Sequence, residues 1–154
     1  MSRGNEATAV IGASPDDVFA IITDISGLPG WNTVITSVVE RPDELVPGAE
    51  WVVELRAMGQ RWRSRSTLVD LDPIGRRFAY RSATDDGNPS WADWTWTVAE
   101  DPDGSRVTVA LELHPVTFWR RVLLAKVRAR QLARTELPRS LAALATAARS
   151  ATPR

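Results

Sequence analysis

The sequence carries few side chains whose types and spacing could support covalent chemistry. His114 is the only histidine among 154 residues, and there is no cysteine. A thiol nucleophile, a zinc–thiolate site and a cluster of histidine ligands are therefore excluded. A Ser-His-Asp triad would have to use His114, and no nucleophile-elbow, phosphate-binding glycine or dinucleotide motif accompanies it. We therefore predict no catalytic residues, no metal site and no cofactor.

Aromatic residues are the more informative group. The chain has seven tryptophans, three phenylalanines and one tyrosine. Large rigid rings supply apolar surface, and a few hydroxyl groups beside them would orient a small molecule in an apolar cavity. The same rings could instead fill a core, which is the simpler interpretation of any single tryptophan. Whether the rings line a cavity or fill a core depends on where the strands and helices place them.

One hairpin is expected where residues 50–58 and 60–71 flank Gly59. If Ala57 pairs with Gln60, cross-strand partners follow in order and alternate residues face opposite sides. An opposite-charge pair between Glu54 and Arg63 supports this register. The interior face then consists of Trp51, Val53, Leu55, Trp62, Ser64, Ser66 and Leu68.

The same alternation organises the later strands. Val107, Val109 and Leu111 form one apolar face. The preceding strand offers Trp94 and Trp96 as a matching face, and the strand before that one offers Phe78 and Tyr80. Strands are expected over residues 5–13, 34–40, 50–58, 60–71, 77–81, 91–100 and 105–114, with two short helices after the first strand and a helix over residues 117–148.

This order of elements predicts an α+β fold with an antiparallel sheet, because consecutive strands are joined by short turns. Seven strands at ~4.8 Å spacing are wider than one helix of ~10–12 Å, so the sheet should curl around the long helix. Pro138 removes a backbone donor and clashes with the carbonyl of Arg134. A kink is therefore expected in this helix.

The segment Ala13–Asp24, followed by Leu28-Pro29-Gly30-Trp31-Asn32, begins with strong helix signals. Ser14 suits the N-cap, Pro15 suits the first helical position, and Asp16 and Asp17 complement the positive helix end. This segment resembles the A-S-P-x-x-V-F and L-P-x-W-N signature of the polyketide cyclase/dehydrase-like branch of the START/Bet v 1-like (SRPBCC) superfamily. The resemblance extends over essentially the whole chain.

The resemblance implies a helix-grip fold, in which a curved seven-stranded antiparallel sheet wraps around a long C-terminal helix. It also implies one domain over residues 1–150 with a disordered tail at 151–154. Such a wrap tends to leave an internal cavity, which favours ligand binding by the aromatic set as a whole. The expected lining is Trp31, Trp51, Val53, Leu55, Trp62, Ser64, Ser66, Phe78, Tyr80, Trp94, Trp96, Leu111, Phe118 and Val122.

The function implied first is binding or transport of a hydrophobic small molecule of lipid, polyketide or isoprenoid type. The alternative is a polyketide cyclase/aromatase or dehydratase, which would need an ionisable side chain in the cavity. Candidates for that side chain are Arg56, Arg81, Glu112 and His114. A second alternative is an RNA- or ribosome-interacting module, because residues 117–154 carry nine basic residues and one acidic residue.

Composition is that of an ordinary soluble domain, with 44% hydrophobic residues and zero net charge. No apolar run approaches the ~20 residues that span a bilayer, and the first residues lack the apolar stretch of a secretory signal peptide. We therefore expect a cytoplasmic protein without integral membrane association and without a DNA partner. A homodimer is left open.

Overall fold

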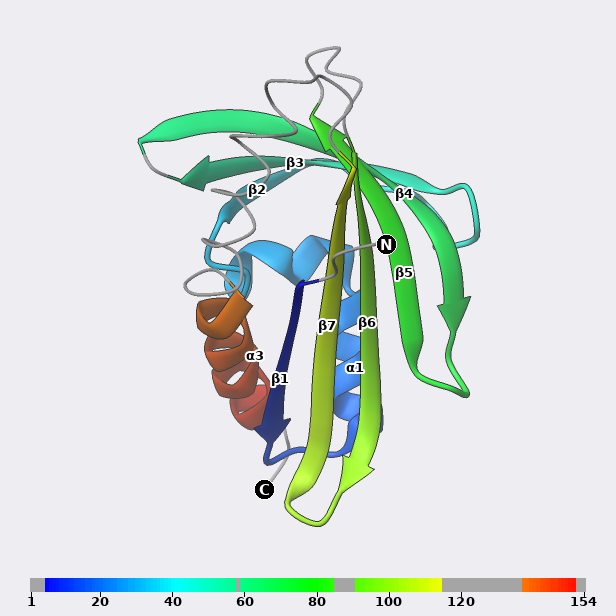
Figure 1. Ribbon diagram of the computed structural model, residues 1–154, viewed down its shortest axis with the longest axis vertical. Helices are drawn as coiled ribbons and strands as arrows, with labels where there is room; N and C mark the ends of the chain where they lie inside the picture. The colour runs from blue at the N-terminus through cyan, green and yellow to red at the C-terminus, as the bar shows by residue number, and fades with distance from the viewer. Residues whose placement is uncertain (1–4, 58, 85–90, 115–136, 152–154) are drawn as a thin grey trace.

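The computed structural model describes residues 5–57, 59–84, 91–114 and 137–151. Its elements form one antiparallel sheet that curves over the helices (Figure 1), and the strands are hydrogen-bonded in the order β1-β7-β6-β5-β4-β3-β2. This arrangement confirms the predicted α+β class and helix-grip fold. The elements are β1 (Asn5–Ile11), α1 (Pro15–Thr23), η1 (Ile25–Gly30), β2 (Ile35–Glu40), β3 (Glu50–Ala57), β4 (Gln60–Asp72), β5 (Arg77–Thr84), β6 (Trp91–Asp101), β7 (Gly104–His114) and α3 (Leu137–Ala151).

The β3–β4 hairpin has the predicted register. Ala57 pairs with Gln60, and the pairing continues to Glu50 opposite Thr67. Gly59 takes a φ of 71° at the turn, a conformation that glycine adopts at little cost. Glu54 lies opposite Arg63 as expected, but its carboxylate makes its ion contact with Arg61, at 3.8 Å between Oε1 and Nε.

Helix α1 begins as its sequence predicts. The Ser14 hydroxyl accepts a hydrogen bond from the Asp17 backbone N–H at 3.2 Å, which caps the first turn. Val18, Phe19 and Ile22 are buried on the side that faces the sheet. The helix ends at Thr23, and the short 3₁₀ helix η1 follows, so two short helices come after the first strand, as predicted.

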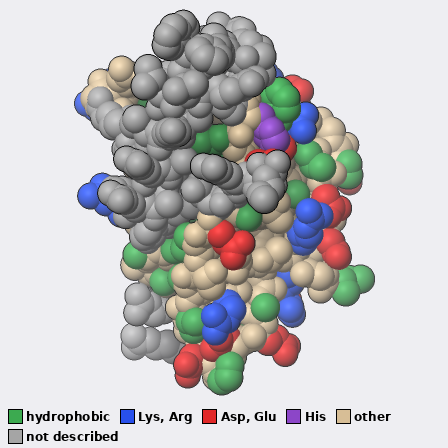
Figure 2. All heavy atoms as spheres, in the orientation of Figure 1, with side chains coloured by type: hydrophobic (Ala, Val, Ile, Leu, Met, Phe, Trp, Pro, Cys, Tyr) green, Lys and Arg blue, Asp and Glu red, His purple; other side chains and the backbone are tan. Residues whose placement is uncertain are grey.

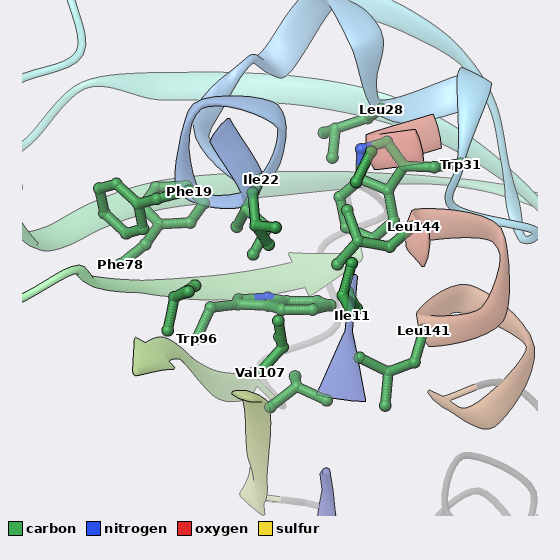
Figure 3. Close-up of a cluster of buried hydrophobic side chains, with 14 of the residues drawn as sticks. Ile11, Phe19, Ile22, Leu28, Trp31, Phe78, Trp96, Val107, Leu141 and Leu144 are labelled. Atoms are coloured by element: carbon green, nitrogen blue, oxygen red, sulfur yellow. The ribbon is translucent and has the colours of Figure 1, made fainter. Parts of the chain in front are cut away.

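Alternation along β5, β6 and β7 directs one set of side chains into the core, as predicted. Trp96 pairs with Val109 on one side and with Phe78 on the other, and all three side chains are buried. Figure 3 shows the Trp96 indole in the middle of the cluster, among side chains from α1, β7 and α3. Each fully buried aliphatic side chain in such a cluster contributes about 1.5–3 kcal/mol relative to exposure.

Helix α3 covers the concave side of the sheet near β1 (Figure 1). Leu141, Leu144 and Ala148 are buried at helical spacing, which anchors the helix along one stripe. The predicted helix began at residue 117, but residues 115–136 lie outside the described part of the chain. Phe118, Val122 and the Arg134 carbonyl of the expected kink are therefore outside it, as are residues 152–154.

Among the helices that the structure describes, none is long and apolar enough to cross a membrane.

Candidate functional site

A cavity lies on the concave face of the sheet, between strands β2–β6 and the segments η1 and α3. The space that the centre of a water-sized sphere can occupy in it is about 70 Å³, and the cavity is partly open to solvent. The described residues that line it are apolar rings and aliphatic chains, interrupted by hydroxyl groups and one amide. They are Leu28, Asn32, Val34, Ile35, Trp51, Val53, Leu55, Ser64, Ser66, Tyr80, Ser82, Trp94, Trp96 and Ser140.

Sheet register explains why these residues meet. Val53 pairs with Ser64, Ser66 with Ser82, and Tyr80 with Trp94, so lining residues lie side by side across four strands. Because side chains alternate along each strand, every second residue of β3 to β6 is directed to the concave face. The cavity therefore depends on pairings between segments far apart in the sequence.

Aromatic rings form a continuous wall along this face. The Trp51 and Phe78 ring centroids are 5.9 Å apart, and Tyr80 stands edge-on to Trp51 at 5.2 Å. Tyr80 and Trp94 are stacked at 6.1 Å. Such pairs contribute about 0.5–1.5 kcal/mol each beyond the area they bury. The wall is therefore preorganised to accept an apolar or flat surface.

Two indole N–H groups hold two of the cavity's hydroxyl groups. Trp94 Nε1 donates to Ser82 Oγ at 2.9 Å, and Trp96 Nε1 donates to the Tyr80 hydroxyl at 3.3 Å. An indole can only donate, so it orients the hydroxyl to which it binds. The tryptophans thus serve both as apolar walls and as positioning groups.

Tyr80 is the only ionisable residue among the described lining residues. Tyr80 is half-buried and borders the cavity, and the neighbouring rings of Trp51, Phe78 and Trp94 partly desolvate its phenol. This desolvation raises the pKa of Tyr80 to about 12, while the hydrogen bond from Trp96 lowers it in part. At neutral pH the phenol is therefore a neutral hydrogen-bond donor and cannot serve as a base.

The raised pKa predicts a loss of stability in alkali. In the unfolded chain the phenol ionises near its ordinary value of 10.0, whereas in the folded protein it keeps its proton to about pH 12. The unfolded state then binds fewer protons, so the free energy of unfolding falls as pH rises from 10 to 12, by about 2 kcal/mol from this group. Tyr80 is the only tyrosine. Ultraviolet absorbance of tyrosinate can therefore follow its titration directly.

Chemical denaturation across the same pH range measures the stability component. The Tyr80→Phe variant is the control and should lack this part of the pH dependence. A tyrosinate titration midpoint near 10 in the folded protein would contradict the prediction.

Eight of the fourteen residues expected at the site line the cavity: Trp51, Val53, Leu55, Ser64, Ser66, Tyr80, Trp94 and Trp96. Four described ones do not line it. Phe78 and Leu111 are buried in the core, and Trp62 is half-buried on β4. Trp31 is also buried in the core, where it meets Trp96 edge-on at 5.4 Å (Figure 3).

Six lining residues were not anticipated from the sequence. Ser82 was missed because β5 was expected to end at residue 81, although Ser82 has the same parity as Tyr80. Ser140 lies four residues before the buried Leu144 and so on the same helical side, which was an available signal. The others come from η1, the first residue of β2 and the loop that joins them: Leu28, Asn32, Val34 and Ile35.

None of the four side chains considered for catalysis lines the cavity within the described structure. Arg56 is exposed on the hairpin. The other three lie on the opposite face of the sheet from Trp94, around Asp93. Asp93 accepts a hydrogen bond from Arg81 Nε at 2.9 Å, its other oxygen is 2.9 Å from His114 Nε2, and Glu112 is 3.6 Å from the same nitrogen.

The His114 Nε2 atom is buried and is not aligned for a hydrogen bond with Asp93, so that contact is an ionic one only when the ring is protonated. The His114 ring stacks on Trp91 at 4.9 Å, and Arg81 lies 5.0 Å from the same indole. On the face that Figure 2 shows, coloured acidic and basic side chains are intermingled. Arg81, Asp93, Glu112 and His114 form a cluster on the outer face, and the sheet separates this cluster from the cavity.

No group of three or more His, Asp or Glu side chains suited to a metal ion occurs in the described ranges. The lining residues that are described carry no carboxylate, imidazole or thiol that could ligate one. The arrangement can enclose an apolar molecule, offer it hydrogen bonds and exclude water from it.

Comparison with solved structures shows the same fold in several proteins. The structure of TTHA0849 from Thermus thermophilus has a TM-score of 0.76 and 21% identity, covering 98% of this chain and 100% of that chain. A START superfamily protein from Mycobacterium smegmatis has a TM-score of 0.69 and 17% identity, covering 97% and 99%. The Zhui aromatase/cyclase from a Streptomyces species has a TM-score of 0.68 and 20% identity, covering 97% and 94%.

A search of curated proteins found no match. The family model described as polyketide cyclase / dehydrase and lipid transport matches residues 5–149, which is nearly the whole sequence. The chain therefore belongs to the polyketide cyclase / dehydrase and lipid transport family.

Proposed function

We propose that this protein binds or carries a hydrophobic small molecule in the cavity on the concave face of its sheet. The observation that carries the proposal is the chemistry of the lining. Aromatic and aliphatic side chains dominate it, hydroxyl groups and one amide interrupt it, and no described lining residue carries a formal charge at neutral pH. Burying an apolar ligand there releases water from both surfaces, while the sparse polar groups set its orientation.

The whole set of predicted ligand contacts belongs to this proposal. Trp51, Val53, Leu55, Trp94 and Trp96 supply apolar surface, and Ser64, Ser66 and Tyr80 supply hydrogen-bonding groups. Trp31, Trp62, Phe78 and Leu111 would act indirectly, by supporting the wall from behind or beside it. The ligand classes proposed are lipids, polyketides and isoprenoids.

The catalytic alternative has less support. Turnover of a polyketide-type substrate by acid–base chemistry needs a group that exchanges a proton near neutral pH. Tyr80 does not do so, and Arg81, Glu112 and His114 lie on the outer face. For the RNA alternative, the basic residues between 117 and 136 lie outside the described part of the chain.

A titration with Nile red, a neutral dye that fluoresces in apolar surroundings, tests the proposal. We expect saturable binding of one dye per protein, because the described lining forms one cavity of suitable chemistry. Competition with emodin, oleic acid and farnesol then separates polyketide-like, fatty-acid and isoprenoid ligands. Native mass spectrometry of the protein from its own host would show a co-purified molecule. Absence of saturable binding by the dye and all three competitors would refute the proposal.

A further inference from the structure

Three polar side chains of the cavity, Asn32, Tyr80 and Ser82, share one property. Their oxygen atoms accept hydrogen bonds from N–H groups of the protein. Trp94 and Trp96 donate to the hydroxyl oxygens of Ser82 and Tyr80, and the Asn32 Oδ1 atom accepts from the backbone N–H groups of Val34 at 3.1 Å and Ile35 at 3.3 Å. Both lone pairs of Asn32 Oδ1 are engaged, and each of the two hydroxyl oxygens has one engaged. The hydrogens of these side chains, two O–H groups and one NH₂, are therefore their main remaining groups for a ligand.

Within the described structure these hydrogens have no acceptor. Neither the Tyr80 nor the Ser82 hydroxyl donates a hydrogen bond there, and all three side chains line the cavity. The described lining has no carboxylate that could accept from a ligand and no cationic side chain that could balance an anion. Ser64, Ser66 and Ser140 can donate or accept, so they do not reverse the bias.

We infer that the cavity selects neutral ligands whose polar groups are acceptors, such as ketone or quinone oxygens, and that Tyr80 and Ser82 are the donors that determine this specificity. The inference rests on the proposed function, whose ligand it narrows. A carbonyl oxygen would accept the free O–H groups. A ligand hydroxyl must also bury its own donor, and a carboxylate or an ammonium group would be desolvated without a counter-charge.

A matched series of three ligands isolates this preference. Fluorene has no polar group, fluorenone replaces its methylene by a carbonyl, and fluorenol replaces it by a hydroxyl on the same ring frame. Displacement of Nile red gives the affinity of each. We expect fluorenone to bind more tightly than fluorenol, and the carbonyl stretch of bound fluorenone to lie at the lower frequency typical of a hydrogen-bonded ketone.

Two variants assign the donors. Tyr80→Phe and Ser82→Ala each remove one O–H and keep most of the wall. We expect the two together to weaken fluorenone binding roughly 2- to 10-fold, the range of one net hydrogen bond, and to leave fluorene binding nearly unchanged. The carbonyl stretch should move toward its value in an apolar solvent. Thr95→Val is the control, because Thr95 alternates with Trp94 and Trp96 and so faces the other side of the sheet.

The ratio of fluorenone to fluorene affinity makes the test independent of a general loss of folding. If the double variant binds both ligands as the unaltered protein does, with an unchanged carbonyl stretch, the inference is wrong and the proposed function stands. If fluorenol binds as tightly as fluorenone, the inference is also wrong. If neither Nile red nor any ligand of the series binds, the proposed function fails together with it.

Discussion

Replacing Gly104 by alanine should destabilise this protein by about 3 kcal/mol or more. Gly104 has a φ of 133°, which side chains other than hydrogen rarely tolerate. A Cβ at this position would lie 2.3 Å from the Ile11 carbonyl oxygen and 2.9 Å from the Ala13 nitrogen. Both are backbone atoms, so the clash cannot be relieved by rotating a side chain.

The Gly104→Ala substitution should also disturb the lining of the cavity. Next to Gly104, the buried Ser105 hydroxyl donates to the Ala13 carbonyl at 2.6 Å, so the β6–β7 turn is fastened to the chain just before α1. Displacing that junction shifts α1 and η1, and η1 contributes Leu28 to the lining. Gly104→Ala should therefore weaken Nile red binding at temperatures where the variant is still folded.

Gly48→Ala is the matched control for this prediction. Gly48 also has a positive φ, 90°, but a Cβ there would meet nothing within 4 Å. Its substitution should cost only the backbone strain, about 1 kcal/mol. Urea denaturation measures both free energies of unfolding. Equal losses for the two variants would show that the close approach at Gly104 has no energetic weight.

Replacing Val53 by phenylalanine should weaken Nile red binding at least tenfold, which corresponds to about 1.4 kcal/mol. Val53 lies in the middle of β3, is 3% exposed and lines the cavity. The larger ring would occupy space that the ligand needs. Because the cavity offers room, the variant should stay folded, with a loss in stability of no more than about 1–3 kcal/mol from local overpacking.

Val69→Phe is the control, because it adds the same ring at a position outside the cavity lining. Val69 is on β4 and 58% exposed, so the added ring lies in solvent. Dye affinity should then match that of the unaltered protein. If Val53→Phe binds Nile red with normal affinity while remaining folded, the dye site is not this cavity.

Most of the fold was predictable because its signals are local. The strand limits follow alternating apolar residues and turn residues, and the Ala57–Gln60 pairing follows from the short turn around Gly59. The α1 cap was predictable from Ser14 and Asp17, since a cap involves neighbours in the chain. Local rules do not place the residues that lack alternation, such as those between η1 and β2.

The candidate site was less predictable because it depends on which side chains of the concave face fill the core and which border the cavity. Trp31 and Phe78, which the sequence predicts as ligand contacts, are buried in the core and are not among the described lining residues. The sequence pattern marks both as large and apolar, which suits a cavity wall and a core equally. Ser82 lies beyond the predicted end of β5, and the role of Asn32 arises from its hydrogen bonds with Val34 and the start of β2.

The amino-acid sequence by itself determined the order of elements, the hairpin register and which face of each strand is apolar, since these follow from local conformation and alternation. It also determined that thiol chemistry is excluded, because there is no cysteine. Only the tertiary structure decided that His114 and Glu112 are separated from the cavity and that the hydroxyls of Tyr80 and Ser82 are held by indoles. Those outcomes depend on packing between segments distant in the chain, where small differences in shape determine whether a ring fills a core or borders a cavity.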